Sequence, residues 1–141
     1  MISAHSASAP DELRTAMEDL VAPLRWRGIE VVLGVAVLAP AEGADLLVER
    51  AAVAIVDAIA ARDDVSLVAI GLVERRGAIR LTVAHDRRGG ATERLALDAD
   101  VRAAADALAG AGGSLAVESG SRFGARYTAT VPATPYAPAR G

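Results

Sequence analysis

The stretch that decides the fold is ADALAGAGGSLAVESGSRFGARYTATVP, residues 105–132. Asp98 or Asp100 can cap a short helix that leads into this stretch and reaches about Leu108, and Gly110 can end that helix. Apolar residues then alternate with polar or small ones in two segments, which is the pattern of half-buried strands. The alternating residues are Leu115 and Val117 in the first segment and Tyr127, Ala129 and Val131 in the second. We therefore expect a helix followed by two strands.

Two further helices and one strand are predicted upstream. The first helix starts at Pro10, and its apolar residues share one face: Leu13, Met17, Leu20, Val21 and Leu24. We expect Pro23 to kink or end this helix and Gly28 to complete the break. The β-branched segment Ile29–Leu38 predicts a strand. Asp45–Arg62 predicts a helix that is apolar nearly all round, and such a helix is mostly buried, here against a sheet.

Two alternating segments follow the long helix and predict an antiparallel hairpin. Their inward-facing residues are Val68, Ile70 and Leu72 in one strand and Ile79, Leu81 and Val83 in the other. A polar loop is expected over residues 87–97. The order α-β-α-β-β-α-β-β predicts an α/β (α+β) two-layer sandwich, with three helices on a mixed, antiparallel-rich sheet of about five strands. We expect one domain over residues 10–132, a flexible arm over 1–9 and a disordered, proline-rich tail over 133–141.

The composition excludes several classes of site. The chain has 141 residues, 52% of them apolar and 3% aromatic, which suits one domain with an aliphatic core. The absence of cysteine excludes disulfides and thiolate sites, and His5 and His85 lie too far apart in the sequence to indicate a metal cluster. A net charge of −3 argues against a nucleic-acid partner. Without a membrane-length apolar run or a signal-peptide pattern, we expect a cytoplasmic chain that does not insert into membranes.

The quoted stretch resembles the end of the ATPase-type domain of sensor histidine kinases, the Bergerat or GHKL fold. That family closes with a helix, a Gly-Gly turn, a strand reading x-L-x-V-x-S, a glycine loop and a final strand that ends in Val-Pro. The matching positions are Gly112, Gly113, Leu115, Val117, Ser119, Gly124, Tyr127, Val131 and Pro132. The likeness covers about residues 11–132. It implies three helices against a mixed sheet, which agrees with the element order above.

The resemblance also implies where ATP and magnesium would bind. In the family the long helix carries a Glu and, four residues later, an Asn that holds the magnesium. In this chain alanines occupy both positions, Ala54 and Ala58. A His often stands four residues after the Asn in the family, and here that position is Arg62. An alanine side chain offers no oxygen to a hard cation. Asp57 lies one residue away, about 100° round the helix, and would serve only in a shifted register. The alternative interpretation of Asp57 is a solvent-facing helix residue.

The family's adenine motif D-x-G-x-G is equally altered. It falls on His85, Asp86, Arg87, Arg88 and Gly89, so only the last glycine is kept. His85 can accept one hydrogen bond, or it can simply cap a strand on the surface. Asp86 would need a one-residue slip, which turns a strand side chain to the opposite face.

The remaining phosphate contacts are missing as well. The segment ATERLALDAD, residues 91–100, contains no second glycine box, and its aspartates would repel a triphosphate near the helix start. The family's late Gly-Thr is Gly124-Ala125. We interpret GAGG, residues 110–113, as a helix stop rather than a phosphate cradle, and DRRGG, residues 86–90, as either a basic turn or a contact for an anion or partner.

Three functions follow from these residues. The first is a degenerate ATPase-like domain with weak or no ATP binding, which acts through a protein partner such as a histidine kinase or response regulator, or as a dimer. The second is a divergent but working ATP- and magnesium-binding domain of a sensor kinase or anti-sigma-type kinase, with Asp57 and Asp86 in shifted register. The third is a module for another small molecule in the inherited cleft. The candidate binding residues are Asp57, His85, Asp86, Gly89 and Gly124.

No catalytic residue is predicted. The chain has no room for the helical hairpin that carries the acceptor histidine of sensor kinases, so autophosphorylation by this chain alone is not expected.

Overall fold

The computed structural model describes residues 9–36, 44–61, 65–75, 78–86, 99–119 and 124–132. Within these ranges the helices and strands follow the predicted order: α2 (Ala9–Trp26), β1 (Glu30–Ala36), α3 (Ala44–Ala60), β2 (Leu67–Arg75), β3 (Ala78–His85), α5 (Ala99–Gly110), β4 (Ser114–Ser119) and β5 (Ala125–Pro132). The expected loop over 87–97 and tail over 133–141 lie outside the described residues. So does the expected arm, except that Ala9 already belongs to α2.

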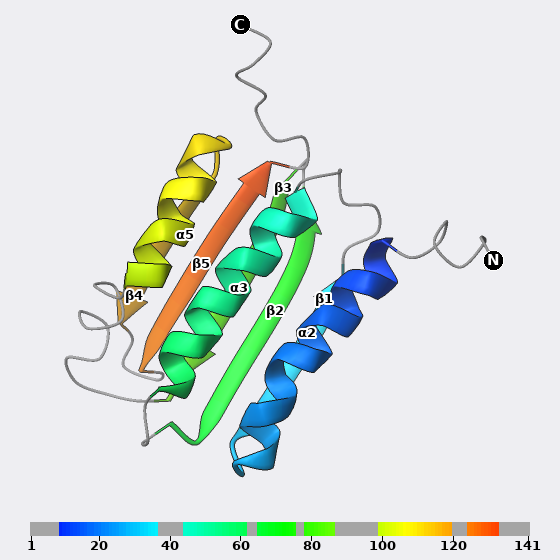
Figure 1. The fold of residues 1–141 in the computed structure, drawn as a ribbon, viewed down its shortest axis with the longest axis vertical. Helices are drawn as coiled ribbons and strands as arrows, with labels where there is room; N and C mark the ends of the chain where they lie inside the picture. Colours follow the sequence, from blue (N-terminus) through cyan, green and yellow to red (C-terminus); the bar gives the residue numbers. More distant parts are fainter. Residues whose placement is uncertain are drawn as a thin grey trace, which may run out of the picture.

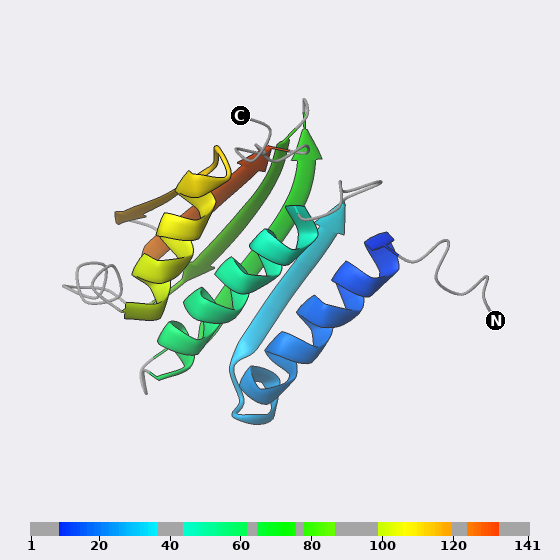
Figure 2. The same cartoon turned by 45° about the horizontal axis from the view of Figure 1, so that its top comes forward.

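The strands form one sheet in the order β1-β2-β3-β5-β4. β1 runs parallel to β2, and the other neighbouring pairs are antiparallel. The described helices α2, α3 and α5 lie side by side over one face of this sheet (Figure 1), and the tilted view in Figure 2 shows the same two layers. This architecture confirms the predicted two-layer sandwich. None of the described helices combines the length and the apolar character needed to cross a bilayer.

The predicted hairpin is formed by β2 and β3. Ile70 lies opposite Val83 and Leu72 opposite Leu81, and all four are buried. The alternate residues of β3, such as Arg80 and Thr82, face the other side of the sheet because strand side chains alternate. The alternation of apolar residues in the sequence therefore predicted correctly that these segments are β-strands and which of their residues are buried.

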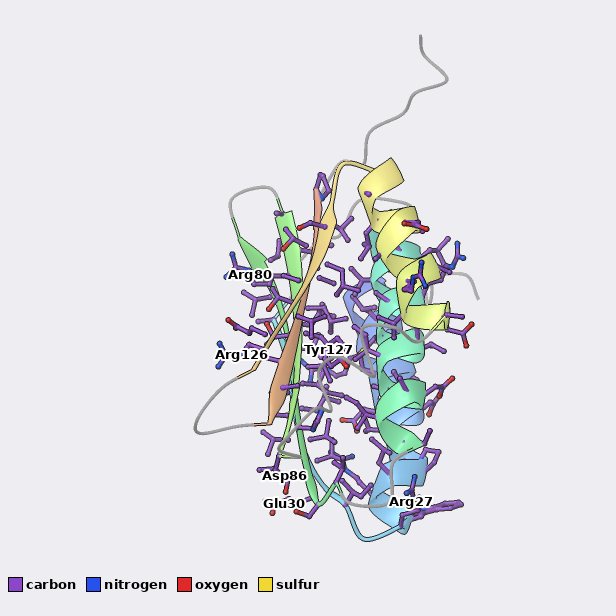
Figure 3. All side chains as sticks on the ribbon, turned by 90° about the vertical axis from the view of Figure 1, so that its left-hand side faces the viewer. Arg27, Glu30, Arg80, Asp86, Arg126 and Tyr127 are labelled. Carbon is purple, nitrogen blue, oxygen red and sulfur yellow. The ribbon has the colours of Figure 1, made fainter. Side chains whose placement is uncertain are left out.

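The core lies between the sheet and the helices. Figure 3 shows Tyr127 pointing from β5 toward the helices, whereas Arg80 and Arg126 point from the opposite face. Tyr127 is the largest fully buried side chain among the described residues, and the eight next in size are aliphatic or Met: Met17, Leu24, Ile55, Ile59, Leu72, Ile79, Leu81 and Leu108. Aliphatic packing carries the stability, as the low aromatic content predicts.

The first helix corrects one expectation. Pro23 does not end α2, which continues to Trp26, and the Arg27 amide still donates to the Pro23 carbonyl at 3.2 Å. Proline in a helix loses its amide donor and crowds the carbonyl four residues earlier, but Val21 and Leu24 on either side are buried in the core, and their packing keeps the segment helical. The break comes at Gly28, whose φ is +86°.

The turn from α5 to β4 confirms that GAGG is a helix stop. Gly112 adopts φ +88°, and the Gly113 amide donates to the Leu108 carbonyl at 2.7 Å, as expected of a glycine-terminated helix. Gly113 also lies against β5: a Cβ atom there would stand 2.2 Å from the carbonyl oxygen of Thr130. Only a glycine permits this approach of the two backbones.

Candidate functional site

A groove of about 690 Å³ opens between α3 and α5, the two helices over the centre and one side of the sheet. Its described lining residues are Leu46, Leu47, Glu49, Arg50, Val53, Ala54 and Asp57 from α3, and Asp100, Ala103 and Ala104 from α5. The size is typical of a site for a small ligand or for a few side chains of a partner. Of the predicted site residues, only Asp57 is in this lining.

Small side chains line part of the groove on both helices. Ala54 on α3 and Ala104 on α5 are 8% and 5% exposed and form part of its floor. Single methyl groups leave space above them that longer side chains would fill. Ala58, one turn further along α3, is 7% exposed and is not part of the described lining.

The polar groups of the groove are mainly acidic. Glu49, Asp57 and Asp100 bring three carboxylates, and Arg50 brings one guanidinium. Asp100 lies in the first turn of α5, where a carboxylate is stabilised by the helix dipole. Among the described residues, no group of three carboxylate or imidazole side chains is arranged to hold a metal ion. The described groove therefore combines an apolar floor with a negative rim.

The two positions that the resemblance assigns to the magnesium-binding helix are both buried alanines. Ala54 and Ala58 lie one turn apart on the side of α3 that packs into the molecule. Neither side chain can coordinate a cation or orient a water molecule. Asp57 is exposed, as the solvent-facing interpretation requires, and it borders the groove.

His85 corrects the interpretation of a surface strand cap. It is 2% exposed and stands at the end of β3, opposite Val68 on one side and Ala125 on the other. Residues 81, 83 and 85 share the helix-facing side of the strand, so alternation carries this imidazole into the core. The Gly124 amide donates to the His85 carbonyl at 2.7 Å, which fixes the backbone of two predicted site residues against each other.

Asp86 turns away from His85 and binds the beginning of β2. Its Oδ1 accepts hydrogen bonds from the amides of Ser66 at 3.0 Å and Leu67 at 3.2 Å, and its Oδ2 accepts one from the Ser66 hydroxyl. Figure 3 shows Asp86 at the lower end of the sheet, close to Glu30. Partial burial works to raise the pKa of Asp86, but the bonds from Ser66, Leu67 and its own backbone amide outweigh it and lower the pKa.

The predicted site residues thus separate into three places. Asp57 borders the groove, His85 and Gly124 meet in the backbone at the end of β3, and Asp86 is engaged with Ser66. Gly89, with Arg87 and Arg88, lies outside the described residues.

Sequence reasoning missed two features of the site. Ser66 stands 20 positions before Asp86 and belongs to no motif, so only the paired strands identify it as a partner. Sequence also did not reveal that Leu46 and Val53 are exposed, because α3 is apolar on almost every side.

The fold has clear counterparts among solved structures. The nucleotide-free catalytic domain of the histidine kinase ThkA matches with a TM-score of 0.67 at 12% identity, over 88% of this chain and 92% of that one. The ATP-binding domain of PrrB from Mycobacterium tuberculosis matches with a TM-score of 0.63 at 18% identity, over 87% and 92%. The mycobacterial sensor histidine kinase MprB matches with a TM-score of 0.60 at 17% identity, over 88% and 96%.

No protein-family model and no curated protein matches the sequence. The structural matches nevertheless cover 87–88% of this chain. The chain therefore has the fold of the catalytic and ATP-binding domains of these histidine kinases.

Proposed function

We propose that this chain is a degenerate histidine-kinase-type ATPase domain, which binds ATP weakly or not at all and acts in signalling through protein contacts in the cytoplasm. The observation that carries the proposal is the pair Ala54 and Ala58, buried at the positions where the resemblance implies the Glu and the magnesium-binding Asn. The framework of the domain is kept, and the side chains that would hold the nucleotide are replaced.

The contacts of Asp86 and His85 support the same proposal. A working domain in shifted register would need the Asp86 carboxylate for adenine, but this carboxylate accepts three hydrogen bonds from the start of β2. The imidazole of His85 is buried in the core instead of standing on the surface. Each lost charge-assisted contact removes about 1.5–3 kcal/mol of binding free energy, and about 1.4 kcal/mol is a tenfold change in affinity.

The charge of the groove adds to these losses. Asp57 and Asp100 both line the space between α3 and α5, and a triphosphate placed there would face carboxylates without a bridging cation held by α3. A protein partner such as a histidine kinase or a response regulator, or a second copy of the chain, fits a domain that has lost its nucleotide but kept an apolar groove.

Isothermal titration with magnesium-ATP tests the proposal directly. We expect a dissociation constant weaker than about 100 μM. The Asp57→Asn and Asp86→Asn variants serve as controls for the alternative, a divergent but working nucleotide site. Tight binding that either substitution weakens at least about tenfold would establish the alternative and overturn the proposal.

A further inference from the structure

The outer side of α3 presents apolar side chains where a solvent-facing stripe is normally polar. Leu46, Arg50, Val53 and Asp57 follow each other at spacings of four, three and four residues, so they share one stripe of the helix. All four are exposed, Leu46 by 63% and Val53 by 40%. Exposed apolar side chains beside a hollow are typical of a surface that another molecule covers.

The length of the stripe suits a helical occupant. The stripe from Leu46 to Asp57 covers twelve residues, which span about 16.5 Å along the axis of α3, or three helical turns. The opposite side is Asp100 and Ala103 of α5, and the floor is formed by alanine methyls. A helix laid between two helices in this way would place side chains at i, i+3, i+4 and i+7 into the hollow.

The charges of the described lining residues favour a positively charged occupant. Leu46 marks one end of the stripe and Asp57 marks the other, and Asp100 lines the groove from α5. With Glu49 there are three carboxylates against the single guanidinium of Arg50 among the described lining residues. Complementary charge steers and orients partners at such surfaces.

We propose that the α3/α5 groove receives a basic amphipathic helix of a protein partner, with its apolar side chains against Leu46 and Val53 and its Lys or Arg side chains toward Asp57 and Asp100. This inference rests on the proposed function, because a groove that holds a nucleotide cannot hold the helix as well.

Fluorescence anisotropy with two synthetic peptides tests the inference. The probe is a fluorescein-labelled helix of about 15 residues with leucines at i, i+3, i+4 and i+7 and lysines elsewhere, and its matched partner carries glutamates in place of the lysines. We expect the lysine peptide alone to bind. The Asp57→Lys/Asp100→Lys variant should weaken binding at least about tenfold, and Val53→Lys should weaken it as well.

The matched control is Asp19→Lys/Asp106→Lys, which reverses the same number of exposed charges on α2 and on α5 outside the groove lining. It should change the affinity less than about twofold. Circular dichroism on each variant establishes that it is folded. Equal losses in the groove and control variants would show binding by general charge and overturn the inference.

Three further outcomes separate the inference from the proposed function. Peptide that binds and is displaced by magnesium-ATP would overturn the proposed function, because ATP binds, and would support the helix site, because the two ligands then share the groove. Absence of peptide binding, together with absence of ATP binding, would overturn the inference and leave the proposed function standing. A dimer in sedimentation velocity that Val53→Lys converts to a monomer would assign the groove to a second copy of the chain and overturn the choice of partner.

Discussion

The carboxylate of Asp86, at the end of β3, holds the beginning of β2 through both the amide and the hydroxyl of Ser66. The carbonyl of Ser66 in turn accepts the amide of Glu30 at 2.9 Å, which starts the parallel pairing of β1 with β2. Ser66 therefore links Asp86, after the end of β3, to the beginnings of β1 and β2 at the same end of the sheet. In this structure Asp86 has a structural role in the sheet.

The first prediction concerns the stability that Asp86 provides. Asp86→Ala should lower the free energy of unfolding by about 1–2 kcal/mol, because hydrogen bonds to a charged acceptor are lost while water can reach the exposed donors. Urea unfolding at pH 7 measures the change. Asp19→Ala, a substitution of an exposed carboxylate on α2, should stay within about 0.5 kcal/mol.

The difference in unfolding free energy between the wild type and Asp86→Ala should become smaller as the pH falls. The pKa of Asp86 is lowered in the folded chain, so its stabilisation is present above the pKa of the unfolded chain and is lost as the pH falls through the folded value. The gap between the wild type and Asp86→Ala should be complete at pH 7 and should narrow steadily below pH 4. A gap that stays constant down to pH 2 would contradict the role assigned to the ionised carboxylate.

The second prediction compares two glycines of the same turn. Gly113→Ala should destabilise the chain by about 1–3 kcal/mol, because its new methyl would stand 2.2 Å from the Thr130 carbonyl and backbone must move to admit it. Gly110→Ala meets no atom within 4 Å and lies at the end of α5, so it should be neutral or stabilising by up to about 1 kcal/mol. Thermal unfolding of both variants checks the contrast, and similar melting temperatures would refute it.

The third prediction concerns the edge strand β1. Arg14 donates to the Val35 carbonyl at 2.9 Å and Arg25 to the Val31 carbonyl at 3.4 Å, so two side chains of α2 occupy backbone acceptors of an edge strand. Edge strands with open backbone groups recruit other chains. The double variant Arg14→Ala/Arg25→Ala should aggregate faster in light scattering at moderate heating, while its unfolding free energy changes by less than about 1 kcal/mol.

The control for this edge effect is Arg80→Ala/Arg102→Ala, which removes two exposed guanidinium groups from β3 and α5. It lowers the net charge by the same amount and leaves β1 unchanged. If both double variants aggregate at the same rate, the effect belongs to net charge and not to the edge.

The sequence predicted the sandwich because its signals are local and periodic. Alternation placed Leu72 and Leu81 in the core, and the same alternation implied that His85 and Asp86 face opposite sides. The sequence could not predict long-range contacts, such as that of Ser66 with Asp86. It also could not predict that α2 continues past Pro23, because this depends on how the residues on either side pack. The groove could not be predicted from the sequence either. An apolar residue such as Val53 is expected in the core, and only the position of the neighbouring helix shows that it is exposed.

The last prediction concerns the position of the missing magnesium ligand. Ala58→Asn should lower the free energy of unfolding by about 1–3 kcal/mol, since Ala58 is 7% exposed and a carboxamide there must be desolvated among aliphatic neighbours. Asp57→Asn, one residue earlier on the exposed side of α3, should change it by less than about 0.5 kcal/mol. Urea unfolding of the two variants gives the comparison. If Ala58→Asn is as stable as the wild type, Ala58 is open to water, and it would then border the groove together with Ala54.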